Sequence, residues 1–165
     1  MGVDITSFAE VKTNGKWIKV DEKIFPEYNY MSSEPFGWRS YGMFGFLANV
    51  NNYSMVPSIK DVKGLPNDSE WLNDPDLDYC YDVGWACSYL TLKELLDFNY
   101  DKQFEDRRYS KEVAPNIFDG GSTCEPGEGQ MVTFREFLGE SFFKHIEVLQ
   151  SLGKPEDVRV VFWFS

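Results

Sequence analysis

The pattern of apolar and polar positions predicts a β-hairpin at the start of the chain. Apolar positions recur between residues 5 and 11, the polar stretch Thr13-Asn14-Gly15-Lys16 follows, and residues 17–20 (WIKV) return. Both central residues of a type I′ turn need a positive φ, so Asn-Gly is the strongest short-range hairpin signal. We therefore expect two antiparallel strands joined at residues 13–16.

Three further segments carry helical patterns. Residues 41–50 (YGMFGFLANV) are almost wholly apolar and predict a short buried helix. Thr91-Leu92-Lys93-Glu94 and Thr133-Phe134-Arg135-Glu136 are capping boxes, in which threonine and glutamate side chains each bind a free backbone amide. They predict helices over 91–98 and 134–152, and the apolar spacing of the second is helical along its length.

The last segment, residues 158–164 (VRVVFWF), is β-branched and aromatic almost throughout. Such continuous apolarity predicts a central strand buried on both faces. The fold class we expect is therefore α+β: a single domain with an antiparallel or mixed sheet, made of the hairpin and this strand and packed with about three helices. Asn67-Asp68-Ser69 is expected to cap one turn. Residues 99–130 are expected to be a long loop.

Composition supports one folded domain and limits its partners. The chain has 165 residues, of which 42% are hydrophobic and 17% aromatic, which excludes bulk disorder. Its 27 acidic residues outnumber 16 basic ones, giving a net charge of −11. The electrostatic field of this negative charge repels phosphate backbones, so we expect no direct nucleic-acid binding. It favours cationic partners instead. The alternative is that the charge only keeps the protein soluble. A homodimer is also compatible with the sequence.

The cysteines and the first residues indicate a reducing compartment. Cys80, Cys87 and Cys124 are an odd number without a C-x-x-C pair, which argues against a disulfide framework and a zinc site. Residues 1–10 lack the features of a signal peptide, and no apolar run approaches the ~20 residues of a membrane span. We expect a cytoplasmic protein without membrane contact. The sole histidine, His145, is expected to be a half-buried core residue.

An acidic run is the first candidate site. It comprises Asp74, Asp76, Asp78 and Asp82, which we assign to contact with a protein partner. Hard cations prefer oxygen ligands, so metal binding is the alternative. The calcium-loop pattern fails, because Tyr79 and Trp85 occupy its glycine and glutamate positions. We therefore expect no metal and no cofactor.

Arginines and loop aromatics form the second candidate site. Arginine forks suit phosphate or carboxylate recognition, and amphipathic aromatics outside periodic segments are typical of binding surfaces. The candidate ligand-binding residues are Trp38, Arg39, Trp85, Arg107, Arg108 and Tyr109. The alternative is that the arginines pair with neighbouring acids such as Glu105 and Asp106, and that the aromatics cover satellite cores.

Several stretches have to be considered together: residues 1–5 (MGVDI), 10–12 (EVK), 14–17 (NGKW), 41–50, 63–66 (KGLP), 89–95 (YLTLKEL), 133–139 (TFREFLG) and 155–164 (PEDVRVVFWF). In this order they resemble a widespread family of small proteins encoded by tailed bacteriophages and prophages. The resemblance spans nearly the whole chain, and its final segment is its most specific part. The family has no established activity.

One departure from the family pattern bears on activity. The family often has a histidine directly after Asp-Ile, where this chain has Thr6. It also often has a His-Ser-His-Ser run before the second helix, where this chain has Trp85-Ala86-Cys87-Ser88. If those histidines bind metal in relatives, this chain lacks the ligands. The resemblance thus implies a member that binds without turnover.

The expected function is that of a phage-encoded, non-catalytic binding protein in the host cytoplasm. It would counter a host defence by sequestering a nucleotide signal or by blocking a basic surface of a host protein. Two alternatives stay open. One is a Mg²⁺- or Mn²⁺-dependent phosphoester hydrolase that uses Asp4 and the 74–82 carboxylates. The other is a virion or assembly protein.

Overall fold

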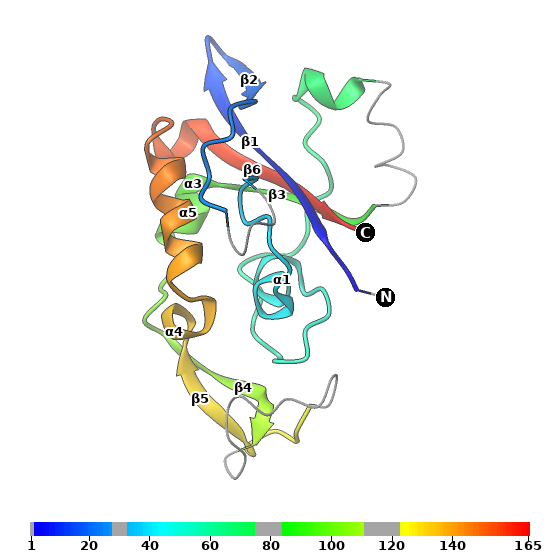
Figure 1. The fold of residues 1–165 in the computed structure, drawn as a ribbon, viewed down its shortest axis with the longest axis vertical. Helices are drawn as coiled ribbons and strands as arrows, with labels where there is room; N and C mark the ends of the chain where they lie inside the picture. Colours follow the sequence, from blue (N-terminus) through cyan, green and yellow to red (C-terminus); the bar gives the residue numbers. More distant parts are fainter. Residues whose placement is uncertain (1, 28–32, 75–83, 111–122) are drawn as a thin grey trace. The chain divides into compact units, whose positions relative to one another are not determined.

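A computed structural model describes residues 2–27, 33–74, 84–110 and 123–165 of the protein (Figure 1). Helices and two antiparallel sheets make it an α+β protein, as predicted. The chain divides into two compact units, each assembled from separate stretches. The first unit comprises residues 1–39, 62–98 and 141–165, and the second comprises residues 40–61 and 99–140. Because the chain passes between the units several times, no single linker marks them in the sequence.

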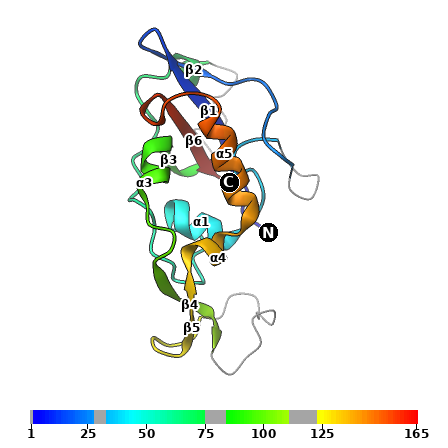
Figure 2. The same ribbon diagram turned by 90° about the vertical axis from the view of Figure 1, so that its left-hand side faces the viewer.

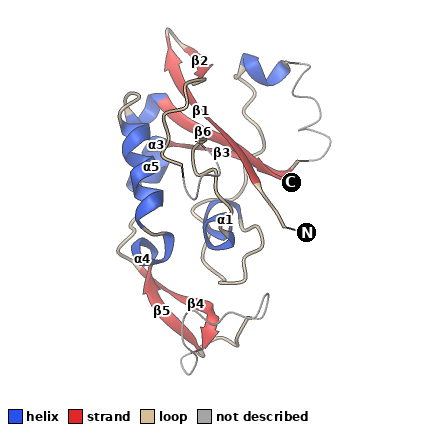
Figure 3. Ribbon diagram, in the orientation of Figure 1, coloured by secondary structure: helices blue, strands red, loops and turns tan. Residues whose placement is uncertain are grey.

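The first unit contains a four-stranded antiparallel sheet with the order β2-β1-β6-β3 (Figure 3). Its strands are β1 (Ile5–Thr13), β2 (Lys16–Lys19), β3 (Trp85–Thr91) and β6 (Val158–Phe164). All seven residues of β6 are buried, which confirms the prediction of a central strand. The turn between β1 and β2 is also confirmed, with φ of 51° at Asn14 and 78° at Gly15. No strand was predicted at β3.

Two helices accompany this sheet, α3 (Leu92–Asp97) and α5 (Glu140–Gln150), and Figure 2 shows α5 beside the strands. The capping box at Thr91 and Glu94 is present as predicted. The prediction of one helix over 134–152 is wrong, because α4 (Phe134–Leu138) ends at Gly139 and α5 starts anew. Gly139 has a φ of 81°, which a continuous right-handed helix does not allow. Among the described residues, no helix is long and apolar enough to span a membrane.

The second unit contains α1 (Tyr41–Ala48), α4 and a two-stranded antiparallel sheet of β4 (Gln103–Ser110) and β5 (Gly129–Thr133). The helix predicted at 41–50 is confirmed, and it ends where Asn49 adopts a φ of 57°. The expectation of a loop throughout 99–130 is wrong. In β4 only Phe104 and Asp106 are buried, so the strand lacks the apolar alternation by which strands are recognised.

An aromatic core in the first unit surrounds His145, which is 1% exposed. Its Nδ1 accepts the N–H of Phe36 at 2.9 Å, so the proton lies on Nε2, which donates to the carbonyl of Pro26 at 2.9 Å. Phe36 stacks on Phe142 at 4.7 Å, and Trp38 meets the imidazole edge-on at 4.9 Å. The core position predicted for His145 is confirmed, and its burial is complete rather than partial.

Replacing His145 tests how this burial affects stability. Burial lowers the pKa of His145 below the ordinary value of 6.5, so the unfolded chain binds a proton at a pH where the folded chain does not. The free energy of unfolding should therefore fall as pH drops below 6.5, by up to about 1.4 kcal/mol per pH unit. His145→Gln, which cannot be protonated, should flatten this slope in urea denaturation between pH 7 and pH 5.

Glu34 provides the control for this measurement. Burial raises the pKa of its carboxyl group, so it acts in the opposite direction and favours the folded state as pH falls. Glu34→Gln removes this opposing effect. The free energy of unfolding should then fall more steeply between pH 7 and pH 5 than it does in the unchanged protein. An unchanged slope in His145→Gln would contradict the assignment to the histidine.

Candidate functional site

A buried ion pair joins the two central strands of the first unit. Glu10 on β1 lies directly opposite Arg159 on β6 in the sheet register. Arg159 Nε lies 2.6 Å from Glu10 Oε1, and the two side chains are 5% and 0% exposed. A carboxylate removed from water in this way must be both paired and hydrogen-bonded. The strands provide only one partner for the Glu10 carboxylate, which is Arg159.

The segment after Asn67 provides the remaining partners. Ser69 Oγ donates to Glu10 Oε2 at 2.6 Å and accepts from Arg159 Nη2 at 2.7 Å. Trp71 Nε1 donates to the same glutamate oxygen at 2.7 Å. The 3-10 turn η1 (Glu70–Asn73) forms where a capped turn was expected, but no side chain caps it. The Ser69 hydroxyl binds the ion pair instead.

Arg159 also connects this buried network to the surface. Its Nη2 donates to Asp68 Oδ1 at 2.7 Å, and the Asp68 side chain is 55% exposed. The hydrogen bond from Arg159 lowers the pKa of Asp68, so this carboxylate is charged at neutral pH. The guanidinium carbon lies 3.9 Å from the centroid of the Trp17 ring and 5.2 Å from that of Tyr89. Arg159 is therefore held by two carboxylates and two aromatic rings.

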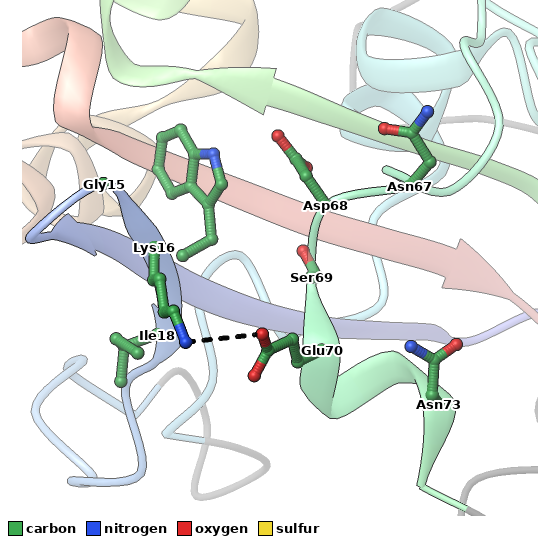
Figure 4. A pocket seen from close by; sticks show the side chains of 9 residues that line it. Gly15, Lys16, Ile18, Asn67, Asp68, Ser69, Glu70 and Asn73 are labelled. Atoms are coloured by element: carbon green, nitrogen blue, oxygen red, sulfur yellow. Dashed lines mark ion pairs between the residues drawn. The ribbon is translucent and has the colours of Figure 1, made fainter.

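A cavity of about 350 Å³ opens between the hairpin turn and η1 (Figure 4). On its rim Lys16 Nζ lies 3.7 Å from Glu70 Oε1, with side chains 69% and 83% exposed. We call this cavity the hairpin pocket. It is lined by Gly15, Lys16, Trp17, Ile18, Asn67, Asp68, Ser69, Glu70 and Asn73.

The lining of the hairpin pocket combines paired charges with amide groups and an aromatic ring. Asp68 is paired with Arg159 at 2.7 Å and Glu70 with Lys16 at 3.7 Å, so each carboxylate of the lining has a cation beside it. Side-chain amides from Asn67 and Asn73 add hydrogen-bonding groups, and Trp17 adds an aromatic surface.

The predicted ligand-binding residues of the first unit lie elsewhere. Arg39 makes two hydrogen bonds to Asp4, at 2.8 Å and 2.9 Å, and the contact lowers the pKa of Asp4. Trp38 is 6% exposed and belongs to the core around His145, so it does not offer the binding surface that its loop position suggested. Trp85 is 44% exposed at the start of β3, 6.0 Å from the ring of Phe164.

The other three predicted residues follow one another on β4 in the second unit. Arg108 binds Asp106 through Nε at 3.1 Å and Nη2 at 2.8 Å, and it lies over the ring of Tyr109. Arg107 Nε donates to the carbonyl of Cys124 at 2.7 Å and lies 4.0 Å from Glu105. The alternative of pairing with Glu105 and Asp106 is confirmed. The hairpin pocket contains none of the six predicted residues.

The acidic run is described only at its first residue. Asp74 follows η1, and its N–H donates to the carbonyl of Trp71. Asp76, Asp78 and Asp82 lie outside the described residues, so their assignment to a protein partner stays a prediction, as does the metal alternative. Within the described ranges no group of three or more histidine, cysteine, aspartate or glutamate side chains is placed to hold a metal ion.

Sequence reasoning missed the residues that build the hairpin pocket. A signal was present, because Arg159 is the one charged residue within an otherwise apolar strand predicted to be buried on both faces. Such an arginine requires a carboxylate partner. The sequence contains many carboxylates, however, and only the β1–β6 register identifies Glu10 as the partner.

Comparisons with known proteins identify no relative: no model of a protein family, no curated protein and no solved structure matches this chain. The resemblance to a phage family therefore stays a prediction.

Breaking the buried pair tests its contribution to stability. Arg159→Met leaves Glu10 charged without its partner, and the free energy of unfolding should fall by about 3–5 kcal/mol in urea denaturation. Adding Glu10→Gln removes the unpaired charge. The free energy of unfolding lost in the double variant should therefore be at least about 1 kcal/mol smaller than the sum of the losses in the two single variants.

The matched control is an exposed ion pair. Arg135 binds Asp101 at 2.9 Å with side chains 53% and 75% exposed, so Arg135→Met should cost no more than about 1 kcal/mol. If the losses from Glu10→Gln and Arg159→Met simply add, the two residues do not act as a coupled pair.

Proposed function

We propose that this is a phage-encoded, non-catalytic binding protein that acts in the infected cell and counters a host defence by covering a basic surface of a host protein. The phage origin and the setting rest on the sequence resemblance. The mode of action rests on charge, because the chain carries a net charge of −11. An acidic surface favours a cationic partner and accelerates its association.

The state of the arginines favours this mode over sequestration of a nucleotide. A phosphate group needs guanidinium or ammonium groups that are not neutralised by acids. Arg39 and Arg108 each bind a carboxylate through two hydrogen bonds, and Arg107 donates to a carbonyl group. A nucleotide would have to displace these partners.

Capture from a bacterial host lysate tests the proposal. The immobilised protein should retain one or a few basic host proteins, to be identified by mass spectrometry. Raising the salt from about 0.1 M to about 1 M shortens the Debye length from about 10 Å to about 3 Å, so these proteins should be released. Each captured protein is then assayed with stoichiometric amounts of this protein, and its activity should be inhibited.

The control is an unrelated acidic protein of the same net charge. If it retains the same host proteins equally well, the binding is nonspecific and the proposal fails. A native mass spectrum of the protein purified from bacterial cytosol separates the two modes of action. A stoichiometric added mass that matches a nucleotide would favour sequestration instead.

A further inference from the structure

The turn at residues 34–37 in the first unit holds its third residue in a strained conformation. The N–H of Gly37 donates to the carbonyl of Glu34 at 3.1 Å, which closes a β-turn with Pro35 and Phe36 at its centre. Phe36 has a φ of 56°. A proline at the second position and a positive φ at the third define a type II turn, in which glycine or asparagine normally occupies the third position. Phenylalanine is strained there, because its Cβ crowds the backbone.

Two hydrogen bonds hold the peptide between Pro35 and Phe36 in this orientation. The carbonyl of Pro35 accepts from the buried hydroxyl of Ser7 on β1. The N–H of Phe36 donates to Nδ1 of His145 on α5 at 2.9 Å. Because the C=O and N–H of a trans peptide point in opposite directions, Ser7 and His145 lie on opposite sides of this peptide. Both partners therefore stabilise the type II turn against the strain at Phe36.

The imidazole of His145 accepts the Phe36 N–H only while it is neutral. A neutral imidazole has one N–H, and Nε2 uses it to donate to the carbonyl of Pro26 at 2.9 Å, which leaves Nδ1 as an acceptor. In the imidazolium ion both nitrogens are donors, so two N–H groups would face each other between His145 and Phe36. The side chain is 1% exposed, so it cannot turn to water instead. The protonated imidazole requires a carbonyl oxygen at Nδ1.

We propose that the peptide between Pro35 and Phe36 is a pH-dependent switch, which flips when His145 takes up its second proton. A rotation of this peptide by roughly 180° converts the type II turn into a type I turn and points the Pro35 carbonyl at Nδ1. The Phe36 N–H then turns toward Ser7, whose hydroxyl accepts as well as donates. The φ of Phe36 becomes negative, which relieves its strain. The switch is a property of the fold and does not depend on the proposed function.

Burial sets the pH range of the switch. It lowers the pKa of His145 below the ordinary value of 6.5, and the hydrogen bond to Pro26 opposes this shift. The titratable residue of the turn itself is Glu34, and burial raises the pKa of its carboxyl group. The flip is therefore expected on acidification below pH 6.5, and the effect of His145 must be separated from that of Glu34. The other charged residues near the turn or beside His145 on α5 are Lys19, Asp21, Lys23, Lys144 and Glu147.

NMR spectroscopy of the whole protein between pH 7 and pH 5 tests the switch. In a type II turn the Hα of the second residue lies against the N–H of the third, and in a type I turn it points away. At pH 7 a strong nuclear Overhauser effect should join Pro35 Hα to the Phe36 N–H. A scalar coupling across the hydrogen bond should join the Phe36 nitrogen to Nδ1 of His145. As His145 is protonated, this coupling should be lost and the Overhauser effect should weaken several-fold.

Two pairs of variants assign the change to its causes. His145→Gln keeps a donor and an acceptor at this position but does not titrate, so its turn should stay the same at pH 7 and pH 5. Glu34→Gln is the control, and it should leave the switch in place. Phe36→Gly and Phe36→Ala both remove the ring, but only glycine adopts a positive φ without strain. The midpoint of the flip should therefore lie up to about one pH unit lower in Phe36→Gly than in Phe36→Ala.

The switch is overturned if the Overhauser effect between Pro35 and Phe36 persists once His145 is protonated, or if the protein unfolds before this effect changes. It is also overturned if His145→Gln still shows the transition or if Glu34→Gln abolishes it. Equal midpoints in Phe36→Gly and Phe36→Ala would contradict the part assigned to backbone strain. Because these measurements involve no host protein, their outcome leaves the proposed function to its own test.

Discussion

The need to neutralise Glu10 and Arg159 in the interior determines how one face of the main sheet is built. A buried carboxylate or guanidinium is costly unless it is paired and its remaining hydrogen-bonding capacity is used. The opposed positions of the two residues on β1 and β6 provide the pair. Ser69, Trp71 and Asp68 provide the remaining hydrogen bonds, so the segment that carries η1 is held against the sheet by polar contacts.

Apolar packing completes this attachment. Leu72 on η1 is buried with Val161 and Trp163 of β6, and Phe8 and Trp71 pack at its edge, 5.1 Å apart between ring centroids. Hydrophobic burial is not directional, whereas hydrogen bonds to a charged pair require one geometry. The apolar contacts thus stabilise the segment against the sheet, and the ion pair determines where along the sheet it lies.

The hairpin pocket is a consequence of this arrangement. Its two walls are the turn before β2 and the start of η1, and Arg159 connects them beneath by contacting both Trp17 and Asp68. The hydrogen-bonded network and the strands therefore hold both walls in place. The rim differs from the walls, because the side chains of Lys16 and Glu70 are largely exposed.

The sequence by itself determined the elements whose signals are local. Asn14-Gly15 specifies the turn through its positive φ angles, Thr91 and Glu94 specify a helix start through mutual capping, and residues 158–164 reveal a buried strand through composition. Only the tertiary structure decided the interruption at Gly139, the mostly polar strand β4 and the partner of Arg159. The hairpin pocket belongs to this second group, because its residues are about fifty positions apart and meet only through sheet register and the burial of one ion pair.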